Sequence, residues 1–266
     1  MNVLLRTASY PDGFHADADI VKGMVVIDGS AKILSEFSLL APTSGRVYGI
    51  LFNYRGALVE ALADEKAGLQ NEPYNGPPDI AVFYLKLPNT VAANNAIIVL
   101  PYDCGAQELR IEASLGVVIG SCASRLTREN AMEAVAGYTI VCDVTIPHTN
   151  YYRPPIQHRC RDGFCPIGPW VVDKRDIVDP ANLGLRVFID GELKGQGHTS
   201  DWIRSIPELL CELTDIVSLC PGDVVLTGTF ANAPIAISGQ TVRIEIDGIG
   251  ALENAVMLEE NTGGAS

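Results

Sequence analysis

The sequence predicts an α+β fold that is dominated by strands and built on a mixed, strongly bent β-sheet. Short apolar runs with the length and composition of strands recur along the whole chain, and only a few helical patterns lie between them. Hydrophobic residues make up 47% of the 266 residues, which is enough to bury a substantial core. We therefore expect one large domain with at most a small appendage.

The first part of the chain predicts a small N-terminal β element over residues 1–45. Within it, two apolar runs in 25–34 form a hairpin that turns through an Asp-Gly-Ser sequence. Leucines among acidic residues then predict a short amphipathic helix over 56–68, closed by glycine. The proline- and asparagine-rich stretch 71–78 is predicted to be a surface loop.

The remaining residues, 46–260, are expected to form the main domain, followed by a polar tail at 261–266. Helices are predicted at 127–135, where Thr127 is the N-cap, and at 201–213. A long loop rich in proline and arginine is predicted from 147 to 169. The predicted strands are 80–85, 97–100, 111–119, 138–144, 185–189, 224–227 and 241–246.

Charge and cysteine content limit the classes of partner. The formal charge of −13 repels phosphate backbones and anionic membranes, so neither nucleic acid nor a membrane surface is an expected partner. A small anionic substrate remains compatible, because a few local arginines can override the overall field. The seven cysteines show no CxxC spacing, and the N-terminus lacks the pattern of a signal peptide. A cytoplasmic protein with free thiols is expected.

Glu112 and Ser114 lie in an apolar strand pattern and are two residues apart. Their side chains therefore point to one face, about 7 Å apart, and could converge on one hard cation. Glu108 is on the same face but about 13 Å from Glu112, too far to share an ion. A solvent-exposed strand face is the alternative, and the local pattern alone favours it.

Two further segments carry candidate polar groups. Asp143 ends an apolar strand just before an irregular loop, where a ligand carboxylate is typically placed, although a cap or turn residue is the simpler interpretation. The loop after it holds Arg153, Arg159 and Arg161, whose forked donors match a carboxylate. The alternative, that these arginines pair with the protein's own acidic residues, is equally compatible with the sequence.

Several motifs in order give the chain a specific resemblance. They are Asn53-Tyr54 and the stretches 84–90, 112–120, 136–143, 168–170 and 221–229. Over most of its length, the chain resembles the fumarylacetoacetate hydrolase family. The resemblance implies mixed β-sheets rolled around a central site, a divalent Mg²⁺ or Mn²⁺ ion, and a dimer at minimum. The metal carboxylates of the family correspond to Glu112 and Asp143, but the third ligand position holds Ser114, so the ion is expected to be weakly held or absent.

The resemblance also assigns roles to other residues. It implies catalytic roles for Glu60 and Arg159. The substrate-binding residues that it implies are Tyr54, Lys86, Arg153, Arg161, Gly228 and Thr229. Three more positions depart from the family pattern: Ala57 replaces a lid histidine, Arg159 replaces a loop lysine, and Pro147 replaces an arginine.

Within the family, the stretches around Arg153 and Arg161 are most similar to the first half of the homoprotocatechuate-pathway enzyme. That enzyme decarboxylates 5-oxopent-3-ene-1,2,5-tricarboxylate and isomerises 2-hydroxyhepta-2,4-diene-1,7-dioate. The resemblance implies a decarboxylase/isomerase acting on small anionic 2-oxo acids, or a subunit of one, alone as a homodimer or beside a metal-bearing homologue. A non-catalytic partner subunit is one alternative. An acylpyruvate-type carbon–carbon hydrolase is another, although Ala57 argues against it.

Overall fold

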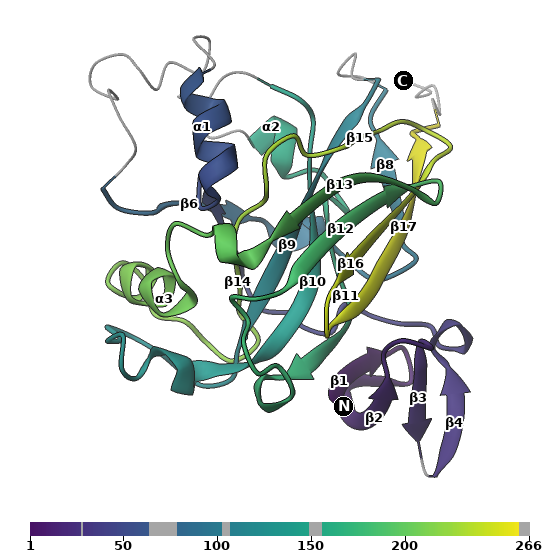
Figure 1. The fold of residues 1–266 in the computed structure, drawn as a ribbon. Helices are drawn as coiled ribbons and strands as arrows, with labels where there is room; N and C mark the ends of the chain where they lie inside the picture. The colour runs from purple at the N-terminus through teal and green to yellow at the C-terminus, as the bar shows by residue number, and fades with distance from the viewer. Residues whose placement is uncertain (28, 64–78, 103–106, 149–155, 261–266) are drawn as a thin grey trace, which may run out of the picture.

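The computed structural model describes residues 1–27, 29–63, 79–102, 107–148 and 156–260, and strands dominate it (Figure 1). This agrees with the predicted fold class. In chain order the strands are β1 (Asn2–Thr7), β2 (Tyr10–Asp19), β3 (Met24–Ile27), β4 (Ser30–Ile33), β5 (Val47–Leu51), β6 (Val82–Lys86), β7 (Val91–Ala92), β8 (Ile97–Leu100), β9 (Leu109–Ile119), β10 (Val135–Thr145), β11 (Cys165–Asp173), β12 (Gly184–Ile189), β13 (Glu192–His198), β14 (Val224–Leu226), β15 (Ile235–Ala236), β16 (Thr241–Ile246) and β17 (Gly250–Leu258).

The helices are few and short. The α-helices are α1 (Arg55–Ala63), α2 (Ile156–Arg159) and α3 (Ile206–Thr214). Single 3₁₀ turns lie at Leu34–Glu36, Pro88–Thr90, Ala131–Ala134, Lys174–Asp176 and Thr199–Asp201. Helix α3 begins with a complete capping box between Ser205 and Glu208. None of the helices in the described ranges is long and apolar enough to cross a membrane.

Two mixed sheets form the body of the molecule. The larger follows the order β4-β3-β2-β1-β11-β10-β9-β14-β5-β6, with β15 added on β9 and β7 on β11. The smaller follows the order β13-β12-β16-β17-β8. Most pairs are antiparallel, but β14 runs parallel to β5, β17 to β8 and β11 to β7. The predicted mixed character of the sheet is confirmed.

Strands β9 and β10 lie at the centre and carry the site. Each has eleven residues, and nearly all of them are buried. Ile111, Ala113 and Leu115 point into the main hydrophobic core. Because side chains alternate along a strand, Glu112 and Ser114 between them must point to the opposite face. One face of the strand therefore stabilises the fold while the other is available for chemistry.

Two predictions of local structure are wrong. The helix predicted at 127–135 is only the 3₁₀ turn Ala131–Ala134, because β10 already begins at Val135. The predicted loop 147–169 contains the start of strand β11, despite Pro166 and Pro169. The pairing of β11 with β10 shifts its register between Tyr138 and Ile140, and such a bulge accommodates proline inside a sheet.

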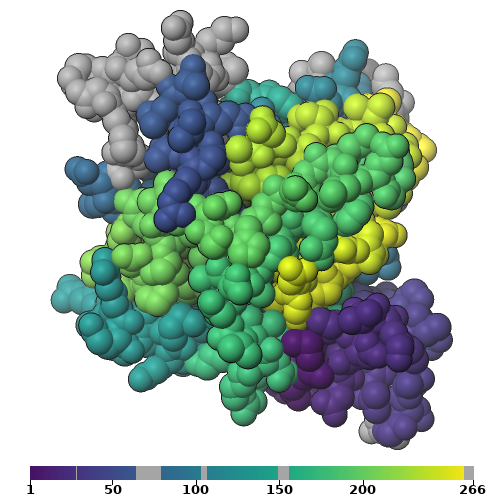
Figure 2. All heavy atoms as spheres, viewed as in Figure 1, coloured from purple at the N-terminus to yellow at the C-terminus, as the bar shows by residue number. Residues whose placement is uncertain are grey.

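The N-terminal β element extends the large sheet. The hairpin predicted at 25–34 is confirmed as β3 and β4, and β1 joins the element to the sheet by pairing antiparallel with β11. In the space-filling view these first residues gather at one corner of the molecule (Figure 2). The candidate residues described below belong to the main body instead.

Candidate active site

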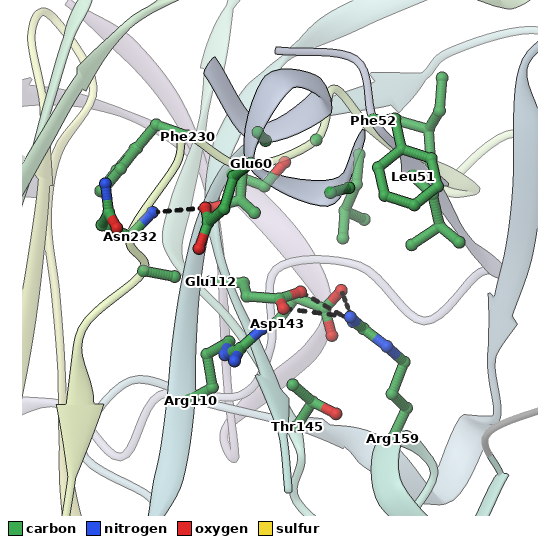
Figure 3. Close-up of a pocket in the computed structure, with 18 of the residues that line it drawn as sticks. Leu51, Phe52, Glu60, Arg110, Glu112, Asp143, Thr145, Arg159, Phe230 and Asn232 are labelled. Carbon is green, nitrogen blue, oxygen red and sulfur yellow. Dashed lines mark hydrogen bonds and ion pairs between the residues drawn. The ribbon is translucent and has the colours of Figure 1, made fainter. Parts of the chain in front are cut away.

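A cavity of about 510 Å³ opens between helix α1, strands β9 and β10, and the segment that follows β14. Its wall is mixed, with apolar side chains around a group of charged residues (Figure 3). The described residues that line it are Ile50, Leu51, Phe52, Ala57, Glu60, Ala61, Tyr84, Arg110, Glu112, Ser114, Asp143, Thr145, His148, Arg159, Leu226, Gly228, Thr229, Phe230, Asn232, Ala233, Pro234 and Ile235.

The register of β9 against β10 brings the two predicted carboxylates together. Glu112 is paired directly with Asp143, and Ser114 is paired with Val141. Directly opposite residues on adjacent strands have Cβ atoms about 5 Å apart, so two carboxylates converge on one point. Glu112 is 7% exposed and Asp143 is 2% exposed, which excludes the alternatives of a solvent-exposed strand face and a simple turn residue.

The guanidinium of Arg159 lies between these two carboxylates. Its Nη1 donates to Glu112 Oε2 at 2.8 Å and to Asp143 Oδ2 at 3.1 Å, and its Nη2 donates to Glu112 Oε1 at 3.0 Å. The pairing with Glu112 is therefore bidentate, the strongest arrangement for arginine and a carboxylate. Arg159 is only 6% exposed, so water screens these charges weakly.

Lys86 holds the other side of Asp143. Its Nζ donates to Asp143 Oδ1 at 2.7 Å, to the Val144 carbonyl at 3.1 Å and to the Arg159 carbonyl at 2.6 Å. An ammonium group has three donors, so these partners use all of them. Lys86 thereby links β6, β10 and the end of α2. Because it holds the Arg159 carbonyl, it fixes the backbone position from which the Arg159 side chain extends into the cavity.

Tyr84 completes the cluster from β6. Its hydroxyl is hydrogen-bonded to Asp143, and its ring lies 5.0 Å from the Arg159 guanidinium carbon. The ring fits because its partner in the β5–β6 register is Gly49, where a Cβ would lie 2.1 Å from Tyr84 Cζ. Glycine is therefore required opposite Tyr84, since any larger residue would displace the ring.

The pKa shifts follow this arrangement. Burial alone would raise the pKa of Asp143, but the charges of Lys86 and Arg159 outweigh it and hold the pKa below its ordinary value of 3.8. Burial likewise opposes the charge of Arg159, but Glu112 foremost holds its pKa well above the ordinary value. Burial raises the pKa of Tyr84, and the Asp143 charge adds to this effect. Tyr84 is therefore a hydrogen-bond donor and not an anion.

The segment after β14 forms the opposite wall. Gly228 has a φ of +92°, which glycine adopts without strain. Asn53 supports the turn: its Nδ2 donates to the Thr227 carbonyl at 2.9 Å, and its Oδ1 accepts from the Arg204 backbone N–H at 2.9 Å. The Asn-Tyr motif therefore has a structural role here. Thr229 Oγ1 is buried and has no hydrogen-bond partner among the described residues, as expected of a group that binds a ligand.

Helix α1 contributes Ala57 and Glu60 to the cavity. Glu60 is exposed at the mouth, where its Oε2 accepts from the Asn232 backbone N–H at 3.0 Å (Figure 3). Ala57 carries no group that could activate water at this position. At this position Ala57 therefore cannot carry a proton, whereas the carboxylate of Glu60 can.

Not all of the predicted substrate-binding residues line the cavity. Tyr54 is 1% exposed and lies outside the lining, in a bridge with Trp202, and Lys86 directs its donors into the protein. Arg161 also lies outside the lining, and its Nε donates to the Gln157 carbonyl at 3.1 Å. Arg153 lies outside the described residues. Direct contact between a ligand in this cavity and Tyr54, Lys86 or Arg161 is not supported by these positions.

Several residues that line the cavity were not predicted from the sequence, among them Tyr84 and the two described next. Arg110 precedes Glu112 by two residues and so shares its face; its guanidinium has no acceptor among the described residues (Figure 3). The alternation Arg110-x-Glu112-x-Ser114 is the signal that could have found it. His148 also lines the cavity, and its ring stacks on His158 with centroids 4.7 Å apart.

Comparison with known proteins decides the family. A family model described as "Fumarylacetoacetate (FAA) hydrolase C-terminal" matches residues 46–257. The chain belongs to the fumarylacetoacetate hydrolase family. Among its relatives, the 4-hydroxyphenylacetate degradation bifunctional isomerase/decarboxylase of Salmonella dublin is 42% identical over 187 residues, which are 70% of this chain and 43% of that protein. The chain spans between 43% and 49% of the bifunctional relatives that it matches.

Solved structures of this family share the fold. The 2-hydroxyhepta-2,4-diene-1,7-dioate isomerase from Mycobacterium marinum is 25% identical, with a TM-score of 0.74 over 99% of this chain and 100% of that chain. A maleylpyruvate hydrolase from Sphingobium sp. SYK-6, solved with manganese(II) and pyruvate, has a TM-score of 0.76 over 97% and 100% of the two chains, at 21% identity. That last likeness concerns the fold.

The described residues of this cavity do not fit a resident divalent ion. The described residues contain no group of three His, Cys, Asp or Glu side chains arranged to hold a metal. Glu112 and Asp143 are already paired with Arg159 and Lys86, so the cluster has no net charge left to neutralise. Ser114 Oγ accepts from the Thr227 backbone N–H at 3.1 Å and adds no charge. Mg²⁺ and Mn²⁺ prefer oxygen ligands that carry uncompensated negative charge.

Proposed function

We propose that this chain is a decarboxylase/isomerase, or the first-half type of subunit of one, that acts on 2-oxo-enoate dicarboxylates or tricarboxylates of aromatic catabolism. The observation that carries the proposal is a cation–carboxylate cluster at the floor of a cavity that is also lined by a second arginine, Arg110, whose guanidinium has no acceptor in the described part of the chain. Bifunctional isomerase/decarboxylases of 4-hydroxyphenylacetate degradation among the relatives support the reaction class. A cavity of about 510 Å³ suits such a small acid.

The chemistry needs a cation at one oxygen of the substrate. When the C–C bond to the departing carboxylate breaks, CO₂ leaves and its electron pair moves into the conjugated system, which places negative charge on the 2-oxygen. A positive group at that oxygen stabilises the dienolate, and a proton delivered to carbon completes the reaction. In the proposal, Arg159 lies near the 2-oxo acid end, with the Gly228 N–H and the Thr229 hydroxyl on the opposite wall.

Two other residues complete the proposed roles. Glu60, exposed at the mouth, moves the proton between the dienolate carbon and solvent. Arg110 binds a remote carboxylate, a role that the sequence assigned to Arg153 and Arg161. In the proposal, a dicarboxylate meets one cation at each end: Arg110 on β9 at the remote carboxylate, and Arg159 on α2 at the 2-oxo acid end.

The turnover of 5-oxopent-3-ene-1,2,5-tricarboxylate, followed by ultraviolet absorbance of the conjugated product, tests the proposal. Arg110→Ala should raise KM about 10- to 100-fold for substrates with a remote carboxylate, the range expected from losing hydrogen bonds to a charged group. It should leave a 2-oxo acid without that carboxylate unaffected. Arg128→Ala, which removes an exposed arginine paired with Glu208, is the control. Equal losses on both substrates would reject the assignment of Arg110.

One observation favours a second candidate, a partner subunit without catalysis of its own. The two family carboxylates are both engaged by Arg159, and α1 offers alanine at position 57. Such a chain would stabilise or complete a metal-bearing homologue. Addition of a homologue that carries the full carboxylate set separates the two candidates: a rate above that homologue's own, with no turnover by this chain alone, would support the partner role.

A further inference from the structure

We infer that the guanidinium of Arg159 is the resident cation of this site: it replaces a divalent metal between Glu112 and Asp143, and it binds the 2-oxo acid end of the substrate directly. The inference rests on the proposed function only in its choice of anion. That the Arg159 guanidinium occupies the space between the two carboxylates follows from the geometry of the cluster alone.

Charge balance is the first argument. Glu112 and Asp143 contribute two negative charges, and Arg159 and Lys86 contribute two positive charges within 3.1 Å of them. All four side chains are buried, with exposed fractions between 2% and 7%. A divalent ion would add two positive charges to a buried cluster that has no net charge. It could bind only by displacing Arg159, which cannot lose its proton to make room.

The second argument is that the guanidinium is held firmly in place. It makes a bidentate pair with Glu112, its face lies over the ring of Tyr84, and Lys86 fixes the backbone carbonyl of Arg159 itself. A long side chain normally loses much rotamer freedom when it becomes ordered. The Arg159 side chain has already lost this rotamer freedom in the folded protein, so it is preorganised to bind an anion.

The third argument concerns the donors that remain. The hydrogen bonds of the Arg159 guanidinium use both N–H groups of Nη1 and one of Nη2, which leaves the Nε–H and the other Nη2–H without acceptors among the described residues. Arg159 lines the cavity, and so do Gly228 and the unpartnered hydroxyl of Thr229. An Nε–H and an Nη–H side by side form the fork that matches the two oxygens of a carboxylate or of a 2-oxo-enolate.

Manganese binding to the full-length chain tests the replacement. Mn²⁺ is titrated into the wild-type protein, Arg159→Ala and Arg46→Ala, and free Mn²⁺ is measured by electron paramagnetic resonance. We expect Arg159→Ala to bind Mn²⁺ at least about tenfold more tightly than wild type, because two carboxylates lose their cation. Arg46→Ala is the matched control: it also frees a buried carboxylate, Asp223, but only one. Equal Mn²⁺ affinity of wild type and Arg159→Ala would overturn the inference.

A second measurement needs no variant and therefore does not depend on whether Arg159→Ala folds. Oxalate, a planar dianion that presents two oxygens to one cation, is titrated calorimetrically into the wild-type chain with EDTA and then with Mn²⁺. The inference predicts the same oxalate affinity in both. A requirement for Mn²⁺ would contradict it. Neither readout involves turnover, so an inactive chain would refute the proposed function and leave these results to decide the inference separately.

Discussion

Lys86 was expected to bind substrate, but its ammonium group donates to protein groups instead. The residue lies in a family motif, and the resemblance therefore implies contact with substrate. In the structure it is 3% exposed and directs each of its donors to the protein: a carboxylate of β10, a carbonyl of β10 and a carbonyl of α2. No sequence pattern states whether a buried lysine faces a cavity or a carboxylate. Only the register of β6 against β5 and the position of α2 decide it.

Replacement of Lys86 should therefore affect the stability of the fold. We expect Lys86→Met to lower the free energy of unfolding by about 3–5 kcal/mol, because the buried Asp143 loses one of its two cations and the buried cluster is left with an uncompensated negative charge. Lys174→Met is the control: within the described residues the Lys174 ammonium donates to two carbonyls, those of Met132 and Glu133, so its loss should cost about 1 kcal/mol. Urea denaturation measures both. A stable Lys86→Met protein that fails only to bind substrate would restore the predicted binding role.

The charge of Asp143 gives the stability a pH dependence. Its pKa is lowered in the folded protein, so its contribution is complete above the ordinary value of 3.8 and is lost as the pH falls through the lowered pKa. The difference in unfolding free energy between wild type and Asp143→Asn should thus be constant above about pH 5 and shrink below it. Denaturation of both proteins across this range measures it. A difference that grows as the pH falls would show that the folded protein holds Asp143 protonated.

At the scale of elements, strands β9 and β10 were predictable and the packing around them was not. Their apolar runs identify both strands, and the period of two correctly places Glu112 and Ser114 on one face. The pairing of Glu112 with Asp143 depends on a register between distant segments, which the sequence does not display. Arg159 lies on α2, a helix of four residues inside a predicted loop, so its approach to both carboxylates had no local signal.

The contact between β5 and β6 offers a test at this scale. Gly49→Ala should destabilise the protein by about 1–3 kcal/mol and disturb the cluster, because its Cβ would overlap the Tyr84 ring. The same change in a Tyr84→Ala background should cost much less, since the ring is gone. Thermal unfolding of the four proteins in this cycle measures the coupling. Equal costs in both backgrounds would mean that the ring does not set the need for glycine.

For the whole molecule, the predicted fold class and family are confirmed, and the cavity gathers Glu60, Glu112, Ser114, Asp143, Arg159, Gly228 and Thr229 from five separate stretches of sequence. Its floor is a neutral, buried cluster in which an arginine lies between the carboxylates that the family resemblance assigns to a metal. Substitution of a single residue, Ser114 for a carboxylate, was visible in the sequence. Arg159 was visible as well, but its position between the two carboxylates was not, because it depends on how α2 packs against Lys86 and Tyr84.

If Arg159 replaces the metal ion, this cavity stabilises a dienolate with an arginine alone. The most direct measurement is the turnover of 5-oxopent-3-ene-1,2,5-tricarboxylate by the pure chain, followed by ultraviolet absorbance, first with excess EDTA and then with excess Mg²⁺. We expect turnover at the same rate in both solutions and a loss of at least about a hundredfold in Arg159→Ala, as for the loss of one oxyanion donor. Turnover that appears only with Mg²⁺ would contradict it.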